Sequence, residues 1–279
     1  MKNVLKCLIL VCSISLFASC KKDSKPAPTP TPVKLDSAAQ SFITSSAITD
    51  TAQQSAINTL VVQLKQNNLW NKFLAIYPMV GGTTATTKLN LKDPRDLDQA
   101  FRITWNGTPQ FQATGVTCLN STDWGDTHLS DSLLAFDNSS ISFYSGTQNQ
   151  TAGYDMGCSN QVSPYNMIAV YEDFTKDIVN TWFNAYDSVP SQPSSTVGLF
   201  TNSSSTGKVV RYVNGTVNRT YGAPANGHTD MNITIGKVVD DPGMGLKECR
   251  FAAIGQGLSD AEALSFYNIV KAYQTKLNR

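Results

Sequence analysis

The stretch Val209-Val210-Arg211-Tyr212-Val213-Asn214-Gly215, continued by Thr216 to Thr220, decides the fold class of this 279-residue chain. Two β-prone runs flank Asn214-Gly215, a dipeptide that readily adopts the positive φ angles of a type I′ turn. The stretch therefore predicts an antiparallel hairpin. Other short strand-like runs, separated by turn residues, predict an all-β sandwich or barrel around it. These runs are 97–104, 111–117, 130–136, 140–144, 153–157, 166–171, 181–186, 196–200, 232–236 and 248–254.

Helical signals stand at both ends of this β-rich region. Asp50 and Gln53 form a loose capping box, and apolar residues then recur at helical spacing. Residues 69–76 predict a second short helix, so the helical segment spans about 50–76. Ser259 and Glu262 form a capping box that opens a final helix over about 259–277. We expect the first helix to cover part of the sheet, and a partner-binding helix is the alternative. Its apolar positions are Ile57, Leu60, Val61 and Leu64.

Three pieces of sequence carry a family resemblance. They are the hairpin strand 209–215, the run Ile233-Thr234-Ile235-Gly236, and residues 251–262, which end in Leu-Ser-Asp-Ala-Glu. In this order they resemble the laminin-G-like branch of the concanavalin A-like lectin/glucanase superfamily. Residues 50–279 are also similar to uncharacterised bacterial lipoproteins and phage structural proteins that carry such a domain. The resemblance implies a jelly-roll β-sandwich and transfers no catalytic residue, because the pieces form a hairpin, a strand and a helix cap.

The N-terminal residues predict that the protein is exported from the cytoplasm. Lys2 and Lys6 precede a short apolar run, and Ala18-Ser19 then precede Cys20, which resembles the lipobox of bacterial lipoproteins. By that resemblance, residues 1–19 are a signal peptide and Cys20 is the site of lipid attachment. Residues 20–34 are rich in Pro and Lys and form a semi-rigid tether, followed by one domain over 35–279. Lys21 after the cysteine favours the outer membrane by the same resemblance. An ordinary cleaved signal is the alternative.

The composition excludes one large class of function. Lys and Arg total 22 against 21 Asp and Glu, and charged residues make up only 15% of the chain. No basic surface is therefore available to neutralise many phosphates, and we expect no nucleic-acid partner. Ser, Thr, Asn and Gln instead account for 90 residues. Such a composition suits both sugar binding and the exposed surface of a β-sandwich.

Three cysteines remain in the mature chain if residues 1–19 are removed and Cys20 carries lipid. Outside the cytoplasm they can form at most one intrachain disulfide, and Cys118 with Cys158 is the pairing that we expect. Three buried thiols, with Cys249 the third, are the alternative. The spacing of the cysteines and of the two histidines does not match a structural zinc site.

Side chains that can bind a ligand are most concentrated in Asp123-Trp124-Gly125-Asp126-Thr127-His128. An indole face can stack on a sugar ring, and the flanking carboxylates can accept hydroxyl hydrogen bonds or ligate calcium. Asp123, Trp124, Asp126 and His128 are therefore the candidate ligand-binding residues. The alternative is a turn whose tryptophan packs on its own sheet. We expect no cofactor, and no motif supports a calcium ion.

Glycoside hydrolysis has little support in this sequence. The reaction needs two carboxyl groups a fixed distance apart, whereas the chain has only three glutamates. Glu262 caps a helix, and Glu172 is adjacent to Asp173 on a predicted strand, so the two would point to opposite faces. We therefore expect a membrane-anchored binding module, with carbohydrate as its ligand. A structural or adhesive protein that contacts surface proteins is the second hypothesis, and an unorthodox glycan-active enzyme is the third.

Overall fold

The computed structural model describes residues 35–135, 137–148, 153–159, 167–172, 196–205, 207–222, 228–238 and 245–279. The predicted signal peptide, Cys20, the tether and the predicted strand 181–186 lie outside these residues. The described α-helices are α1 (Ser37–Ser46), α2 (Thr51–Gln66), α3 (Thr84–Thr87) and α4 (Asp260–Lys276). The described strands are β1 (Phe73–Tyr77), β2 (Thr104–Asn106), β3 (Gln110–Phe111), β4 (Val116–Thr117), β5 (Trp124–Ser130), β6 (Asn138–Ser145), β7 (Gly153–Ser159), β8 (Met167–Glu172), β9 (Gly198–Ser205), β10 (Lys208–Val213), β11 (Thr216–Tyr221), β12 (Asn232–Ile235) and β13 (Glu248–Gly255).

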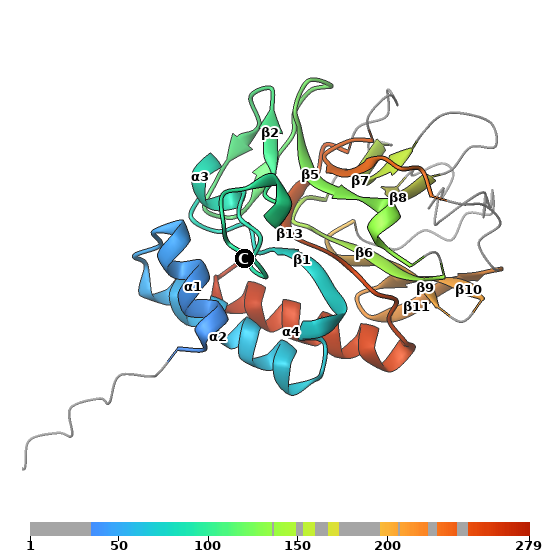
Figure 1. Ribbon diagram of the computed structural model, residues 1–279, viewed down its shortest axis with the longest axis horizontal. Coiled ribbons are helices and arrows are strands. Elements are labelled where there is room, and N and C mark those ends of the chain that lie inside the picture. The colour runs from blue at the N-terminus through green and yellow to red at the C-terminus, as the bar shows by residue number, and fades with distance from the viewer. Residues whose placement is uncertain are drawn as a thin grey trace, which may run out of the picture. The chain divides into compact units, whose positions relative to one another are not determined.

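The strands form two antiparallel sheets, which confirms the mostly β sandwich (Figure 1). The large sheet has the order β11-β10-β9-β6-β13-β4-β3. Strand β6 pairs along one edge of β13, while β4 and β1 pair with successive parts of β13. The small sheet has the order β2-β5-β12-β7-β8.

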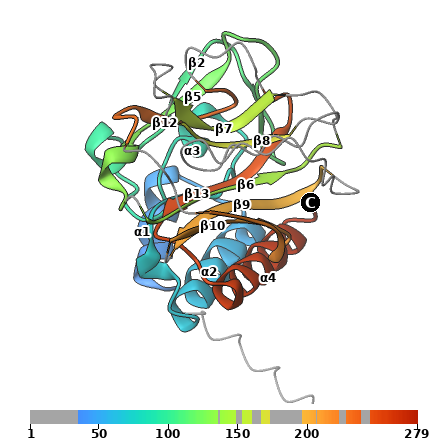
Figure 2. The same ribbon diagram turned by 90° about the vertical axis from the view of Figure 1, so that its right-hand side faces the viewer.

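Residues 35–279 are arranged in three layers, with the large sheet in the middle (Figure 2). Its inner face packs on the small sheet through buried residues such as Phe143 and Ile254, which meet Ile233. Its other face, the helix face, packs on α1, α2 and α4, where Phe266 lies 5.9 Å from the Phe251 ring. Each fully buried side chain of this size stabilises the fold by about 1.5–3 kcal/mol. The helices therefore cover one face of the sandwich, as expected from the stripe on α2.

The hairpin forms as the Asn-Gly signal predicts. Val213 pairs with Thr216, and the two turn residues Asn214 and Gly215 have φ angles of 52° and 74°. Gly215 also lies directly under α4, because a Cβ added there would come within 2.8 Å of the Leu264 Cα. The turn therefore fixes where the hairpin meets the C-terminal helix.

Residues 69–76 are not a second helix, and that prediction is wrong. After a short 3₁₀ turn the chain enters β1, which pairs with β13 from Phe73 opposite Gly255 to Tyr77 opposite Ala252. Residues of β1 face both cores, Ile76 the helical one and Ala75 the one between the sheets. When a short apolar run is buried on both faces, its hydrophobic pattern does not distinguish a helix from a strand.

Two predicted strands contain 3₁₀ turns. Residues 131–133 form such a turn after Ser130, whose hydroxyl accepts from the backbone N–H of Ser132. The Asp131 carboxylate is buried there and accepts from the backbone N–H of Thr229 at 2.7 Å. Residues 98–100 form a second 3₁₀ turn, so β2 begins only at Thr104. At residues 131–133 a local side-chain hydrogen bond to the backbone competes with strand pairing.

The predicted disulfide is not formed. Within the described part of the chain Cys118, Cys158 and Cys249 are buried thiols, and no bridge joins Cys118 to Cys158. Cys158, on β7 of the small sheet, accepts a hydrogen bond from the hydroxyl of Thr229. Cys118 instead follows β4 of the large sheet, where Val116 pairs with Cys249. The Cys118 sulfur lies at Gly236, where an added Cβ would come within 2.4 Å of it, and Gly236 donates to the carbonyl of Asp155, three residues before Cys158.

Candidate functional site

Strand β5 places the tryptophan of the predicted site on the outer face of the small sheet. Its burial alternates strictly, with Gly125, Thr127 and Leu129 buried and the intervening residues partly exposed. Asp126 pairs with Thr104 of β2 on one side and with Thr234 of β12 on the other. Trp124 and Asp126 therefore stand side by side on a face that no described helix covers, as the layers in Figure 2 show.

Asp123 lies immediately before this strand and is buried, with 1% of its surface exposed. Its Oδ1 accepts from the backbone N–H of Thr108 at 2.8 Å, and its Oδ2 accepts from the backbone N–H of Leu119 and the amide of Asn120. These bonds join the loop between β2 and β3 to the loop between β4 and β5. Asp123 is therefore a structural carboxylate, and the structure places it out of reach of a ligand at the surface.

A shallow hollow of about 280 Å³ opens beside Trp124. The Asn232 amide donates to Asp126 Oδ2 at 3.3 Å, and the backbone N–H of His128 donates to Asp126 Oδ1 at 2.8 Å. The carboxylate is thus held in place with lone pairs still directed outward. The lining residues are Trp124, Asp126, Asp230, Met231, Asn232 and Thr234.

The Trp124 ring has one cationic neighbour. The Lys237 ammonium lies 5.1 Å from the ring centroid and donates to the Ser121 carbonyl. That hydrogen bond fixes the lysine beside the indole. An indole with a cation over one face and amide and carboxylate groups at its edge can contact a ligand that has apolar C–H faces and hydroxyl edges through the part of the ring that the cation leaves open.

His128 is on the same strand but does not line the hollow. Its backbone has a φ of 55°, and its Nε2 lies 2.7 Å from the Thr104 hydroxyl and 3.4 Å from Asp98. The ladder between β5 and β12 is irregular at this point, which turns the side chain toward β2. Of the four predicted residues, the structure therefore brings Trp124 and Asp126 together and separates Asp123 and His128 from them.

Asn232, Asp230 and Met231 complete the hollow and were missed from the sequence. They lie about a hundred residues after Trp124, and only strand pairing brings them to it. The sequence does predict a strand at 232–236. It does not predict which strand pairs with it, so it gives no sign that these residues lie beside Trp124.

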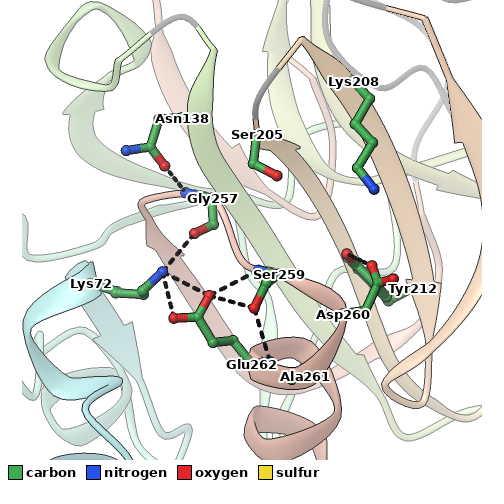
Figure 3. A pocket seen from close by; sticks show the side chains of 10 residues that line it. All are labelled: Lys72, Asn138, Ser205, Lys208, Tyr212, Gly257, Ser259, Asp260, Ala261 and Glu262. Atoms are coloured by element: carbon green, nitrogen blue, oxygen red, sulfur yellow. Dashed lines mark hydrogen bonds and ion pairs between the residues drawn. The ribbon is translucent and has the colours of Figure 1, made fainter.

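A second and larger hollow of about 480 Å³ lies at the end of the helix face where α4 begins (Figure 3). It is polar, and its tyrosine, Tyr212, is 1% exposed. This hollow therefore has no aromatic platform on which a sugar can stack. Among the described residues no three His, Cys, Asp or Glu side chains are grouped to hold a metal ion. No helix within the described ranges is long and apolar enough to cross a membrane.

No protein-family model matches this chain, and no curated protein sequence matches it. Solved structures do resemble it. A mutant of Trypanosoma rangeli sialidase with trans-sialidase activity matches 78% of this chain and 39% of its own, at 6% identity and a TM-score of 0.51. Domain 4 of AbnA, an extracellular GH43 arabinanase from Geobacillus stearothermophilus in complex with arabinotriose, matches 70% of this chain and 98% of the domain, at 15% identity and a TM-score of 0.41.

The binding domain of botulinum neurotoxin serotype D matches 71% of this chain and 52% of its own, at 12% identity and a TM-score of 0.44. The chain thus spans well under two thirds of the sialidase and of the neurotoxin domain. At these identities the likeness concerns the fold alone, and the sialidase match supports the β-sandwich.

Proposed function

We propose that this chain is a non-catalytic carbohydrate-binding protein that holds a glycan on the outer face of its small sheet, at Trp124. The observation that carries the proposal is the partly exposed indole beside the hydrogen-bonded pair Asp126–Asn232, on the face of the sandwich that the helices leave uncovered. We infer further that the sandwich is of the laminin-G-like kind.

The chemistry of the hollow matches the two sides of a sugar ring. The C–H face of a pyranose stacks on an aromatic ring, and its hydroxyl groups need both donors and acceptors at the rim. Asp126 supplies acceptors, and Asn232, already bonded to it, retains a second N–H and a carbonyl oxygen. Each Asp126 oxygen accepts one hydrogen bond from a neighbouring donor and keeps a second lone pair that can accept from a sugar hydroxyl.

A glycan array is the direct test, because the ligand is unidentified. Full-length protein is expected to bind a subset of glycans, and Trp124→Ala is expected to lower that binding at least about fivefold, since the comparable stacking of a nucleobase on an aromatic side chain contributes on the order of 1–3 kcal/mol. Tyr267→Ala removes an aromatic side chain from α4, on the opposite side of the large sheet, and serves as the matched control. A folded protein that binds no glycan, or whose binding Trp124→Ala leaves intact, would contradict the proposal.

We also propose that residues 1–19 are a signal peptide, that lipid attached to Cys20 anchors the chain in the outer membrane, and that residues 20–34 space the domain from the bilayer. The support is the sequence pattern around Cys20. Metabolic labelling with palmitate should mark the wild-type protein and leave Cys20→Ser unlabelled. Label retained in Cys20→Ser would overturn the anchor.

A further inference from the structure

Polar side chains from several strands and from α4 line the second hollow, on the helix face of the large sheet. Asn138, Ser205 and Lys208 stand opposite one another on β6, β9 and β10. They therefore form one row that points to the same side as Tyr212 and spans roughly 10 Å, two strand spacings. The first turn of α4 forms the facing wall (Figure 3).

Several groups around this hollow are already committed to each other. The Lys72 ammonium lies 2.7 Å from Glu262 and donates to the Gly257 carbonyl at 3.1 Å. Glu262 and Ser259 cap the backbone of α4. The positive end of the helix is thus satisfied by its own residues, and Lys72 and Glu262 neutralise each other.

Two opposite charges in the hollow remain apart. Lys208 directs its ammonium into the hollow, and no hydrogen bond or ion pair to it is found among the described residues, so it lies more than 4.0 Å from the Asp260 carboxylate (Figure 3). Tyr212 donates to Asp260 Oδ1 at 2.7 Å, which orients that carboxylate and leaves Oδ2 open. Burial, followed by the neighbouring Asp260, raises the pKa of the Tyr212 phenol, so it remains a donor at neutral pH.

Neutral donors complete the set. Asn138 Oδ1 accepts from the Gly257 backbone at 2.9 Å, which fixes the amide and leaves its N–H₂ group available, and the Ser205 hydroxyl stands between Asn138 and Lys208. Gly257 makes this close packing possible, because a Cβ there would lie 2.1 Å from the Ser204 carbonyl. A ligand that satisfies the hollow needs an anionic group for Lys208 and hydroxyl groups for Asp260, Asn138 and Ser205.

We propose that this hollow is a second saccharide site, selective for a sugar residue that carries a carboxylate. Lys208 binds the carboxylate through a charge-assisted hydrogen bond, and Asp260 accepts from the ring hydroxyls. A uronic acid has both kinds of group on one ring. The site is separate from Trp124, on the other side of the large sheet, and does not depend on the function proposed there.

The test uses full-length protein and two matched probes, digalacturonate and its methyl ester, titrated by calorimetry at low ionic strength. The two have the same ring hydroxyls and differ at the carboxyl groups, which are charged in the acid and neutral and methylated in the ester. The acid is expected to bind saturably and about tenfold more tightly than the ester, the factor that one charge-assisted hydrogen bond of about 1.4 kcal/mol supplies. Equal binding of acid and ester, or no binding of either, would overturn the proposal.

Variants locate the site. Lys208→Gln is expected to lose the preference for the acid, and Lys208→Arg, which keeps the charge, to retain most of it. Lys271→Gln, an exposed lysine of α4 outside the hollow, and Trp124→Ala should both leave the preference unchanged. Unaltered preference in a folded Lys208→Gln protein, loss of acid binding in Trp124→Ala, or tighter binding of a zwitterion such as glycylglycine would each count against this assignment.

Discussion

Asp123 and Trp124 are neighbours in the chain with opposite environments. The Asp123 carboxylate is buried and accepts hydrogen bonds from its own loop and from the loop between β2 and β3, while the Trp124 indole stands on the uncovered face of the small sheet. The two environments differ because β5 begins at Trp124. Asp123 is the last residue of the preceding loop and bonds to loop residues, whereas Trp124 is the first residue of the strand.

This contrast predicts different effects of two aspartate substitutions. Asp123→Ala should destabilise the protein by about 3 kcal/mol, because buried donors to a charged acceptor lose their partner. Asp126→Asn keeps the shape of a partly exposed side chain and should change stability by less than about 1 kcal/mol while it weakens glycan binding. Urea unfolding measures the first effect and the glycan array the second. Equal stability of the two variants would show that Asp123 is not a structural carboxylate.

The buried thiols give a second prediction at the scale of single residues. Burial, followed by the nearby Asp123 charge, raises the pKa of Cys118 to about 12, and burial raises that of Cys249 as well. Because the thiolate is the reactive form, neither thiol should react with Ellman's reagent in the native protein at about pH 8. Both should react after denaturation. Rapid modification of Cys118 or Cys249 in the native state, identified by peptide mapping, would contradict the burial.

At the scale of elements, the β10–β11 hairpin meets α4 through Gly215. Gly215 and Gly207 both have positive φ, 74° and 76°, but a Cβ at Gly207 would meet nothing within 4 Å. An alanine at either position carries the backbone cost of roughly 1–2 kcal/mol. Gly215→Ala also forces a methyl group against α4 and should be at least about 1 kcal/mol less stable than Gly207→Ala. Thermal unfolding of the two variants measures the difference, and equal losses would show that the helix does not rest on the turn.

The cap of α4 should make stability depend on pH. Burial opposes ionisation of Glu262, but hydrogen bonds from Lys72 and Ser259 outweigh it and lower the pKa of the carboxyl below 4.5. A carboxyl whose pKa is lowered by folding stabilises the protein above its unfolded pKa, and that contribution is lost as the pH falls through the folded value. Glu262→Gln should therefore be less stable than wild type at about pH 7 and should lose less stability than wild type on acidification to about pH 3. An identical acid profile for the two proteins would refute this linkage.

The elements divide into those that local sequence determines and those that tertiary pairing determines. Asn214-Gly215 and the Ser259–Glu262 capping box each carry their own signal, and the hairpin and α4 were predicted from them. Strand β1 has no such signal. Pairing with β13 turns residues 73–77 into a strand although their apolar pattern reads equally well as a helix, which is the usual way in which tertiary contacts override local preference.

At the scale of the whole molecule, the position of the helices decides which face can bind. Helices α1, α2 and α4 bury the helix face of the large sheet, apart from the polar hollow at Lys208. The outer face of the small sheet is left uncovered by the described helices. The sequence predicted a covering helix and an aromatic ligand site, but it did not reveal that they lie on opposite sides, because that depends on strand order.

Dependence on strand order also explains why only some residues of the candidate site were predicted from the sequence. Trp124 and Asp126 were predicted because an indole and a carboxylate lie close together in one short segment, whereas Asn232 reaches them only through the β5–β12 ladder. His128 was predicted from the same segment, and the irregular ladder near its position turned it away.

The most direct test of the account is the position of a bound glycan in a crystal structure of the complex with the strongest ligand from the array. We expect a sugar ring against the Trp124 indole, with hydroxyl groups hydrogen-bonded to Asp126 or Asn232. A neutral glycan found instead on the helices, or at the Lys208 hollow with the Trp124 face empty, would contradict the central claim.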